Sequence, residues 1–164
     1  MRINKNFRVE EFVHPRFVTN FGKSSKWYVS KWQIETAIFI RSLFGDKPMR
    51  LNDWHYGGHL KNRGTRLPNS SVGSFYSQHK FANAIDFDIQ GIAVETCFEL
   101  IIEYQDELLK RGITTVESLT FTPTWIHLDG RQTGLDHMLV VSPRAKMRTS
   151  KKGFFIEDKF YYDE

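Results

Sequence analysis

A histidine and an aspartate in one short stretch are the residues of this sequence best suited to chemistry. His79 and Asp86 lie seven residues apart in Ser77-Gln-His-Lys-Phe-Ala-Asn-Ala-Ile-Asp86. The run 84–89 alternates in a way that is typical of a β-strand, with Asp86 on the face opposite to Ile85. A carboxylate on an apolar strand is costly to bury unless it is paired or binds a metal. We therefore expect Asp86 to meet His79, either as a simple pair or as two ligands of one metal ion.

Two ligands do not make a zinc site, and a second stretch offers a third. Trp125-Ile-His-Leu-Asp129 also alternates, so Trp125, His127 and Asp129 are expected on one face of a strand. His127 is therefore the candidate third ligand.

Helices and strands that could position these residues follow from periodicity and from stop signals. A helix is expected from Ser30 to Phe44, with Ser30 and Gln33 at capping-box spacing, and a second from about Ala93 to Arg111. Strands are expected at 49–56, 84–89, 113–121, 124–129 and 138–142, with a long irregular stretch at 57–76. This order favours an α+β fold, a mainly antiparallel sheet with two principal helices packed on it.

The ends of the chain read differently from its middle. Residues 1–28 are rich in aromatic and basic residues and are expected to wrap over the core. Residues 143–164 are expected to form a peripheral C-terminal arm, anchored by the aromatic residues Phe154, Phe155, Phe160, Tyr161 and Tyr162. A length of 164 residues suits one domain, so we expect 1–164 to fold as a single domain.

Composition bounds the class of protein. A hydrophobic fraction of 40% predicts a globular chain, and the net charge of +4 favours anionic partners without identifying one. Lysines and arginines near Arg66 are few and scattered, so no nucleic-acid partner is expected. No run approaches a membrane span, and the first residues lack a signal-peptide pattern. We expect no membrane partner and a cytoplasmic product as synthesised. The single cysteine, Cys97, is expected to be a core residue.

Together, three motifs carry a resemblance to a known family. Ser77-x-His79-x-x-Ala82-x-Ala84-x-Asp86 is similar to the SxHxxGxAxD signature of the M15 zinc peptidases, which share their fold with hedgehog proteins. Upstream, Gly64-Thr-Arg66 resembles the family's Gly-x-Arg. Downstream, residues 125–129 resemble its aromatic-x-His-x-Asp strand. The three motifs occur in the family's order and span about residues 50 to 130.

The resemblance implies a zinc ion bound by His79, Asp86 and His127, with water in the fourth position. Such a site suits zinc, which takes nitrogen and oxygen ligands and keeps one position open for catalysis. The resemblance also implies that Arg66 holds a substrate carbonyl oxygen or the developing oxyanion. Ser77 is expected to hydrogen-bond a ligand or the substrate.

At two positions the sequence departs from the family pattern. The signature glycine is Ala82, and the glutamate that often lies three residues before the last histidine is Thr124. The general base must then come from elsewhere, and two candidates stay open. Glu117 lies on the preceding predicted strand, and Asp129 lies two residues beyond His127. We favour Glu117, because Asp129 could instead orient a ligand.

Bacterial peptidoglycan is the substrate that the resemblance implies, with D-alanyl carboxypeptidase and endopeptidase action both open. The resemblance further implies either a phage endolysin or a peptidase carried in a virion with phage proteins as partners. In either case we expect it to act at the host cell wall. The alternative is a non-catalytic M15-like protein, either a structural virion component or a wall-binding module.

Overall fold

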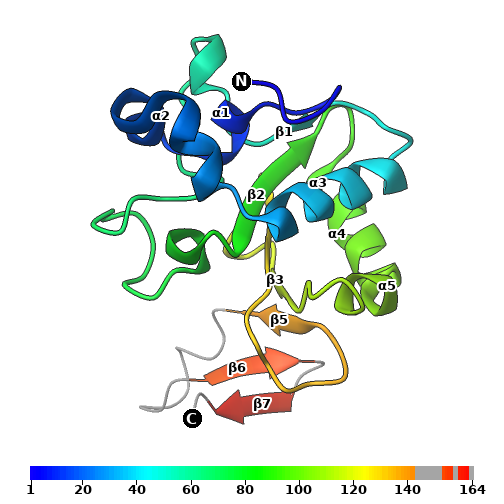
Figure 1. Cartoon of the computed structure of the whole chain (residues 1–164). Helices are drawn as coiled ribbons and strands as arrows, with labels where there is room; N and C mark the ends of the chain where they lie inside the picture. Colours follow the sequence, from blue (N-terminus) through cyan, green and yellow to red (C-terminus); the bar gives the residue numbers. More distant parts are fainter. Residues whose placement is uncertain (143–152, 157–158, 163–164) are drawn as a thin grey trace. The chain divides into compact units, whose positions relative to one another are not determined.

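A computed structural model describes residues 1–142, 153–156 and 159–162, the last two segments as backbone only (Figure 1). The chain divides into two compact units, residues 1–91 and residues 92–164. The single domain expected from the sequence stays a prediction.

Residues 1–28, which the sequence predicts to wrap over the core, contain three short helices, α1 (Val9–Phe12), α2 (Pro15–Phe21) and the 3-10 helix η1 (Gly22–Tyr28). They enclose a small apolar cluster in which Val9, Val13 and Phe17 are buried. The rings of Phe17 and Tyr28 pack with centroids 4.4 Å apart. The segment therefore has a hydrophobic cluster of its own.

Helix α3 (Lys31–Leu43) confirms the first predicted helix and its cap. The Ser30 hydroxyl accepts a hydrogen bond from the Gln33 backbone N–H, and the Gln33 side chain accepts one from the Ser30 backbone N–H. Gln33 is fully buried, and its Nε2 donates to the carbonyl oxygen of Ala84 at 3.0 Å. This bond ties the start of α3 to the strand that carries Asp86.

Strand β2 (Ala84–Ile89) has the predicted bounds and pairs antiparallel with the short β1 (Met49–Arg50). The strand predicted at 49–56 is wrong beyond Arg50, because Asp53 turns the chain. Its Oδ1 accepts from the Leu60 backbone N–H at 2.7 Å, and Trp54–Tyr56 form the 3-10 helix η2. Before β2, the irregular stretch leads into a further 3-10 helix, η3 (Gln78–Phe81).

The second unit begins with two helices where one was predicted. Helices α4 (Val94–Glu103) and α5 (Gln105–Leu109) are separated at Tyr104, whose ψ of 19° leaves the helical range. Just after this break, the Gln105 side chain accepts a hydrogen bond from the Met138 backbone N–H at 3.3 Å. The continuous helix expected over 93–111 is therefore wrong, although Leu108 remains fully buried.

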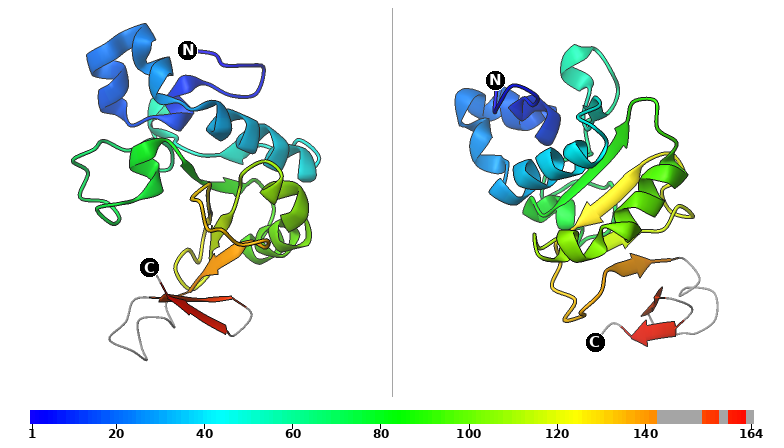
Figure 2. Two further views of the ribbon diagram at one scale, coloured as in Figure 1. Left: turned by 60° about the horizontal axis from the view of Figure 1, so that its bottom comes forward. Right: turned by 90° about the vertical axis from the view of Figure 1, so that its right-hand side faces the viewer.

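Three short strands follow. Strand β3 (Thr115–Glu117) pairs antiparallel with β4 (Ile126–Asp129) and parallel with β5 (Leu139–Val141). Figure 2 shows β4 in yellow and β5 in orange. All three lie within the ranges predicted for them and are shorter. The predicted arm at 143–164 lies partly outside the described residues, and so do the side chains of its aromatic anchors. The described backbone there forms β6 (Gly153–Ile156) and β7 (Lys159–Tyr162), an antiparallel pair.

Strands β1 to β5 form one sheet in the order β1-β2-β4-β3-β5. The β3–β5 ladder is parallel, whereas the β1–β2 and β3–β4 ladders are antiparallel, so the sheet is mixed. The α+β class predicted from the sequence is confirmed at this level. Within the described part of the chain, no helix has both the length and the apolar character needed to cross a membrane.

Candidate metal centre

His79 lies on η3, is only 1% exposed, and has both ring nitrogens engaged. Its Nδ1 lies 2.8 Å from the carbonyl oxygen of Gly64, and its Nε2 lies 3.2 Å from Asp86 Oδ1. A carbonyl oxygen can only accept, so Nδ1 carries a proton. In the neutral ring, Nε2 then presents its lone pair on the side of Asp86, as a metal ligand requires.

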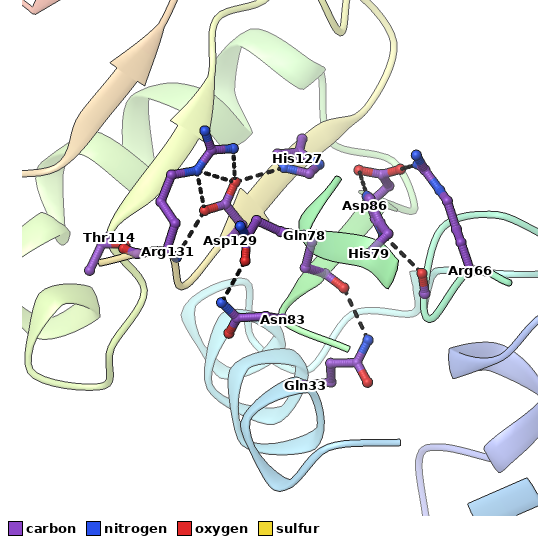
Figure 3. A network of polar contacts seen from close by, with 12 residues as sticks. Gln33, Arg66, Gln78, His79, Asn83, Asp86, Thr114, His127, Asp129 and Arg131 are labelled. Atoms are coloured by element: carbon purple, nitrogen blue, oxygen red, sulfur yellow. Dashed lines mark hydrogen bonds and ion pairs between the residues drawn. The ribbon is translucent and has the colours of Figure 1, made fainter. Parts of the chain in front are cut away.

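Asp86 lies buried in β2 and uses its two carboxylate oxygens differently. Oδ1 faces His79, and Oδ2 accepts a hydrogen bond from Arg66 Nη2 at 3.0 Å (Figure 3). Arg66 is itself held, because its Nε donates to the Asn62 carbonyl oxygen at 2.6 Å. The structure therefore places Arg66 on the candidate ligand Asp86, and its expected contact with substrate stays a prediction.

Gly64 is required where it stands, because the backbone at this point is pressed against the N-terminal segment. A Cβ atom built on Gly64 would lie 2.1 Å from the carbonyl oxygen of Phe12. That same oxygen accepts from the Thr65 backbone N–H at 2.6 Å. Only glycine fits this close approach, which fixes the carbonyl that holds His79.

Ala82 occupies the place of the signature glycine and has a left-handed backbone, with φ 54° and ψ 32°. It ends η3 and turns the chain into β2. A left-handed conformation favours glycine and costs another residue about 1–2 kcal/mol. Ser77 lies at the opposite end of η3, half-buried, and its expected hydrogen bond to a ligand or substrate stays a prediction.

His127 lies buried on β4, with Asp129 two residues further on. His127 Nε2 lies 3.1 Å from Asp129 Oδ2. Asp129 is fully buried and accepts further hydrogen bonds from Arg131, including Nε to Oδ1 at 2.8 Å and Nη2 to Oδ2 at 2.5 Å (Figure 3). Because Nε2 faces Asp129, Nδ1 is the candidate metal-binding atom of the ring.

Burial alone would raise the pKa of Asp129. Hydrogen bonds from His127 and Arg131, together with the positive charge of Arg131, outweigh that effect and lower the pKa from 3.8 to about 2. A carboxylate with so low a pKa is a weak proton acceptor near neutral pH. The contacts of Asp129 therefore suit orientation of His127 better than general-base catalysis.

Glu117 is the other candidate base, and the strand register places it opposite His127. In the β3–β4 ladder, Thr115 faces Asp129 and Val116 faces Leu128. Continuing this register by one residue pairs Glu117, the last residue of β3, with His127 on β4. Directly opposed residues share a face of the sheet, with Cβ atoms about 4.5–5.5 Å apart. Glu117 is half-buried.

His79, Asp86 and His127 each offer one ligand atom, and these atoms all lie within 4.8 Å of one another. Two ligand atoms of a tetrahedral zinc, each about 2.0–2.1 Å from the metal, lie about 3.3 Å apart. The 3.2 Å between His79 Nε2 and Asp86 Oδ1 matches that spacing. The second polar atom of each side chain is hydrogen-bonded. His79 contacts the Gly64 carbonyl oxygen, Asp86 contacts Arg66, and His127 contacts Asp129. The donor set and its supporting contacts thus fit a zinc ion.

Comparison of the chain with protein-family models, with curated proteins and with solved structures gave no significant match. The likeness to M15 peptidases therefore remains a likeness of motifs.

Two supporting contacts do not follow from the sequence motifs. The Gly64 carbonyl acts through a backbone atom, which side-chain types do not reveal. Arg131 follows Asp129 by two residues, and an acidic and a basic residue so placed at a strand end could have suggested a pair.

Proposed function

We propose that this protein is a zinc-dependent peptidase that hydrolyses peptide bonds of bacterial peptidoglycan. The observation that carries the proposal is the buried group of His79, Asp86 and His127, whose ligand atoms lie within 4.8 Å of one another. A structural pair of His79 and Asp86 alone would not explain a third buried ligand at that distance. A bound zinc ion would polarise the scissile carbonyl and lower the pKa of a water molecule toward neutrality.

Glu117 is the general base in this proposal, and Asp129 is the residue that orients His127. The register of β3 and β4 supports this division, because continuing it by one residue pairs Glu117 with His127. Glu117 takes the proton of the attacking water and passes it to the leaving amine. Asp129, engaged by Arg131 and His127, keeps its negative charge throughout.

Arg66 has a double role here. Its Nη2 holds Asp86, and its Nη1 lies close enough to Gly73 that a Cβ atom there would come within 2.8 Å of it. The cationic group therefore lies beside a candidate ligand, where it also attracts a substrate carbonyl or the developing oxyanion. Ser77 lies in the same region, 3.5 Å from that Cβ position, and supplies a hydroxyl for the substrate.

Peptidoglycan as the substrate rests on the resemblance to M15 peptidases, and so does the choice between an endolysin and a virion-carried enzyme. The test combines metal analysis with digestion of purified peptidoglycan, followed by mass spectrometry of the released peptides. We expect about one zinc per chain, lost in His127→Ala, and new peptide ends that a chelator prevents. Cleavage that persists in excess chelator would refute the zinc mechanism.

A non-catalytic role is the second candidate, and Thr124 is the observation that favours it. This residue stands where the family often has its glutamate, is exposed, and carries no proton-accepting carboxylate. Such a protein would keep its zinc as a structural virion component or a wall-binding module. Zinc binding with peptidoglycan binding but no released peptides would favour this candidate over the peptidase.

A further inference from the structure

Arg131 belongs to none of the three motifs that suggest a zinc site. It nevertheless contacts Asp129, which is hydrogen-bonded to the proposed ligand His127. It lies just after β4, and its Nε and Nη2 grip both oxygens of Asp129. Its backbone N–H also donates to Asp129 Oδ1 at 3.1 Å. A paired, fork-shaped contact of this kind fixes a carboxylate in direction as well as in charge.

The backbone of Arg131 is anchored as well. The Thr114 hydroxyl donates to the Arg131 carbonyl oxygen, and the Thr114 backbone N–H donates to the Asp129 carbonyl oxygen at 3.0 Å. Thr114 immediately precedes β3, so the segment that carries Arg131 is fastened to the neighbouring strand. Arg131 therefore approaches Asp129 from a fixed position.

Asp129 passes this constraint to His127. It is fully buried, and its Oδ2 is the atom that faces His127 Nε2 at 3.1 Å. An ionised carboxylate only accepts hydrogen bonds, so it selects the ring form with the proton on Nε2. That form leaves the Nδ1 lone pair unprotonated. A protonated or rotated Asp129 would no longer make this selection.

We propose that Arg131 is a positioning residue, which acts through Asp129 to hold His127 in the tautomer whose Nδ1 is available to a metal. The assignment deepens the proposed function, since it concerns one of the proposed zinc ligands. Partners of this kind typically account for 10–100-fold in metal affinity. Arg131 touches neither the metal nor the substrate in this scheme.

The experiment compares wild type with Arg131→Gln, Arg131→Lys and the control Arg111→Gln. Arg111 also pairs with a carboxylate of the second unit, Glu107 at 3.0 Å, but both partners are exposed. Zinc affinity is measured by competition with a chromophoric chelator. The His127 tautomer is read in metal-free protein from the ¹⁵N shifts of its ring, assigned with His127→Ala.

We expect Arg131→Gln to weaken zinc binding by about 10–100-fold and to lose the pure Nε2–H form of His127. Arg131→Lys, with a point charge in place of a fork, should fall between Gln and wild type. Arg111→Gln should match wild type in both measurements. A folded Arg131→Gln protein with unchanged affinity and an unchanged tautomer would overturn the proposal.

Circular dichroism establishes first that each variant is folded. If Arg131→Gln does not fold, the Arg131→Lys variant provides the test. A zinc affinity and a His127 tautomer equal to those of wild type in Arg131→Lys would then overturn the assignment. The tautomer is measured without metal or substrate, so it tests Arg131 even if the protein hydrolyses nothing. Failure of the proposed function and failure of this inference are thereby distinguishable.

Discussion

The charge of Asp129 makes a measurable contribution to stability, and replacing Asp129 by Asn should remove it. In the folded protein the pKa of Asp129 is about 2, against an ordinary value of 3.8. A depressed pKa means that the stabilisation is fully present above about pH 4 and is lost as the pH falls through 2. Each pKa unit corresponds to about 1.4 kcal/mol, so about 2.5 kcal/mol of unfolding free energy is at stake, of which about 2 kcal/mol is lost by pH 2.

Urea unfolding of zinc-free protein, followed by tryptophan fluorescence between pH 6 and pH 2, measures this contribution. Zinc is removed beforehand, because metal binding has a pH dependence of its own. We expect the unfolding free energy of wild type to fall by about 2 kcal/mol more than that of Asp129→Asn over this range. The other carboxylates titrate in both proteins, so they cancel in the difference.

Asp136→Asn is the matched control. Asp136 also pairs with a histidine, His137 at 2.7 Å, but its side chain is 99% exposed. Solvent screens such a pair, so the control should follow the wild-type pH dependence closely. Parallel curves for wild type and Asp129→Asn would refute the account of Asp129 as a buried carboxylate held ionised by Arg131 and His127.

Three further substitutions test the site. Glu117→Gln should keep zinc but lower the rate of peptide release by about 100-fold or more, because the variant lacks the proton acceptor; the rate comes from chromatography of released peptides. Gly64→Ala should destabilise the fold by about 1–3 kcal/mol in urea unfolding and weaken zinc binding, because its Cβ would lie 2.1 Å from the Phe12 carbonyl oxygen. Ala82→Gly should stabilise the protein by about 1 kcal/mol, because it relieves the left-handed backbone at φ 54°; calorimetry should show a Tm higher by about 2–4 °C.

For each of these substitutions, one result would contradict the reasoning behind the prediction. Full activity of Glu117→Gln would move the general base elsewhere, with Asp129 the next candidate. A Gly64→Ala protein as stable as wild type would mean that the backbone at Phe12 can move away from the added Cβ atom at little cost in free energy. A Tm for Ala82→Gly at or below that of wild type would show that Ala82 bears no net strain.

The elements that carry the proposed ligands could be predicted because their signals are local. Alternation located β2 at its observed bounds, and the pair of Ser30 and Gln33 located the start of α3. The break at Tyr104 could not be predicted in this way. The apolar stripe continues through it to the buried Leu108, and periodicity records only which side chains are buried.

The supporting contacts of the candidate site were harder to foresee than the proposed ligands. His79 and Asp86 stand out because such residues are seldom buried in apolar surroundings unless they are paired or bind a metal. The Arg66 contact to Asp86 depends on how a loop folds back on η3, where the Arg66 backbone N–H donates to the His79 carbonyl at 3.0 Å. Sequence spacing says nothing about such a return. Similarly, the pairing of Glu117 with His127 follows only from continuing the register of β3 and β4 by one residue.

The close contact between Gly64 and Phe12 links local unfolding at the N-terminal segment to the first proposed ligand. Residues 12–14 make two backbone hydrogen bonds to Thr65. The Phe12 carbonyl oxygen accepts from the Thr65 N–H, and the His14 N–H donates to the Thr65 carbonyl oxygen at 3.2 Å. If α1 detaches in a brief fluctuation, the strand-like bridge between Val13 and Thr65 opens with it. The Gly64 carbonyl then releases the His79 ring. Hydrogen exchange at the Thr65 amide would report this opening, and zinc, by favouring the closed state, should slow it.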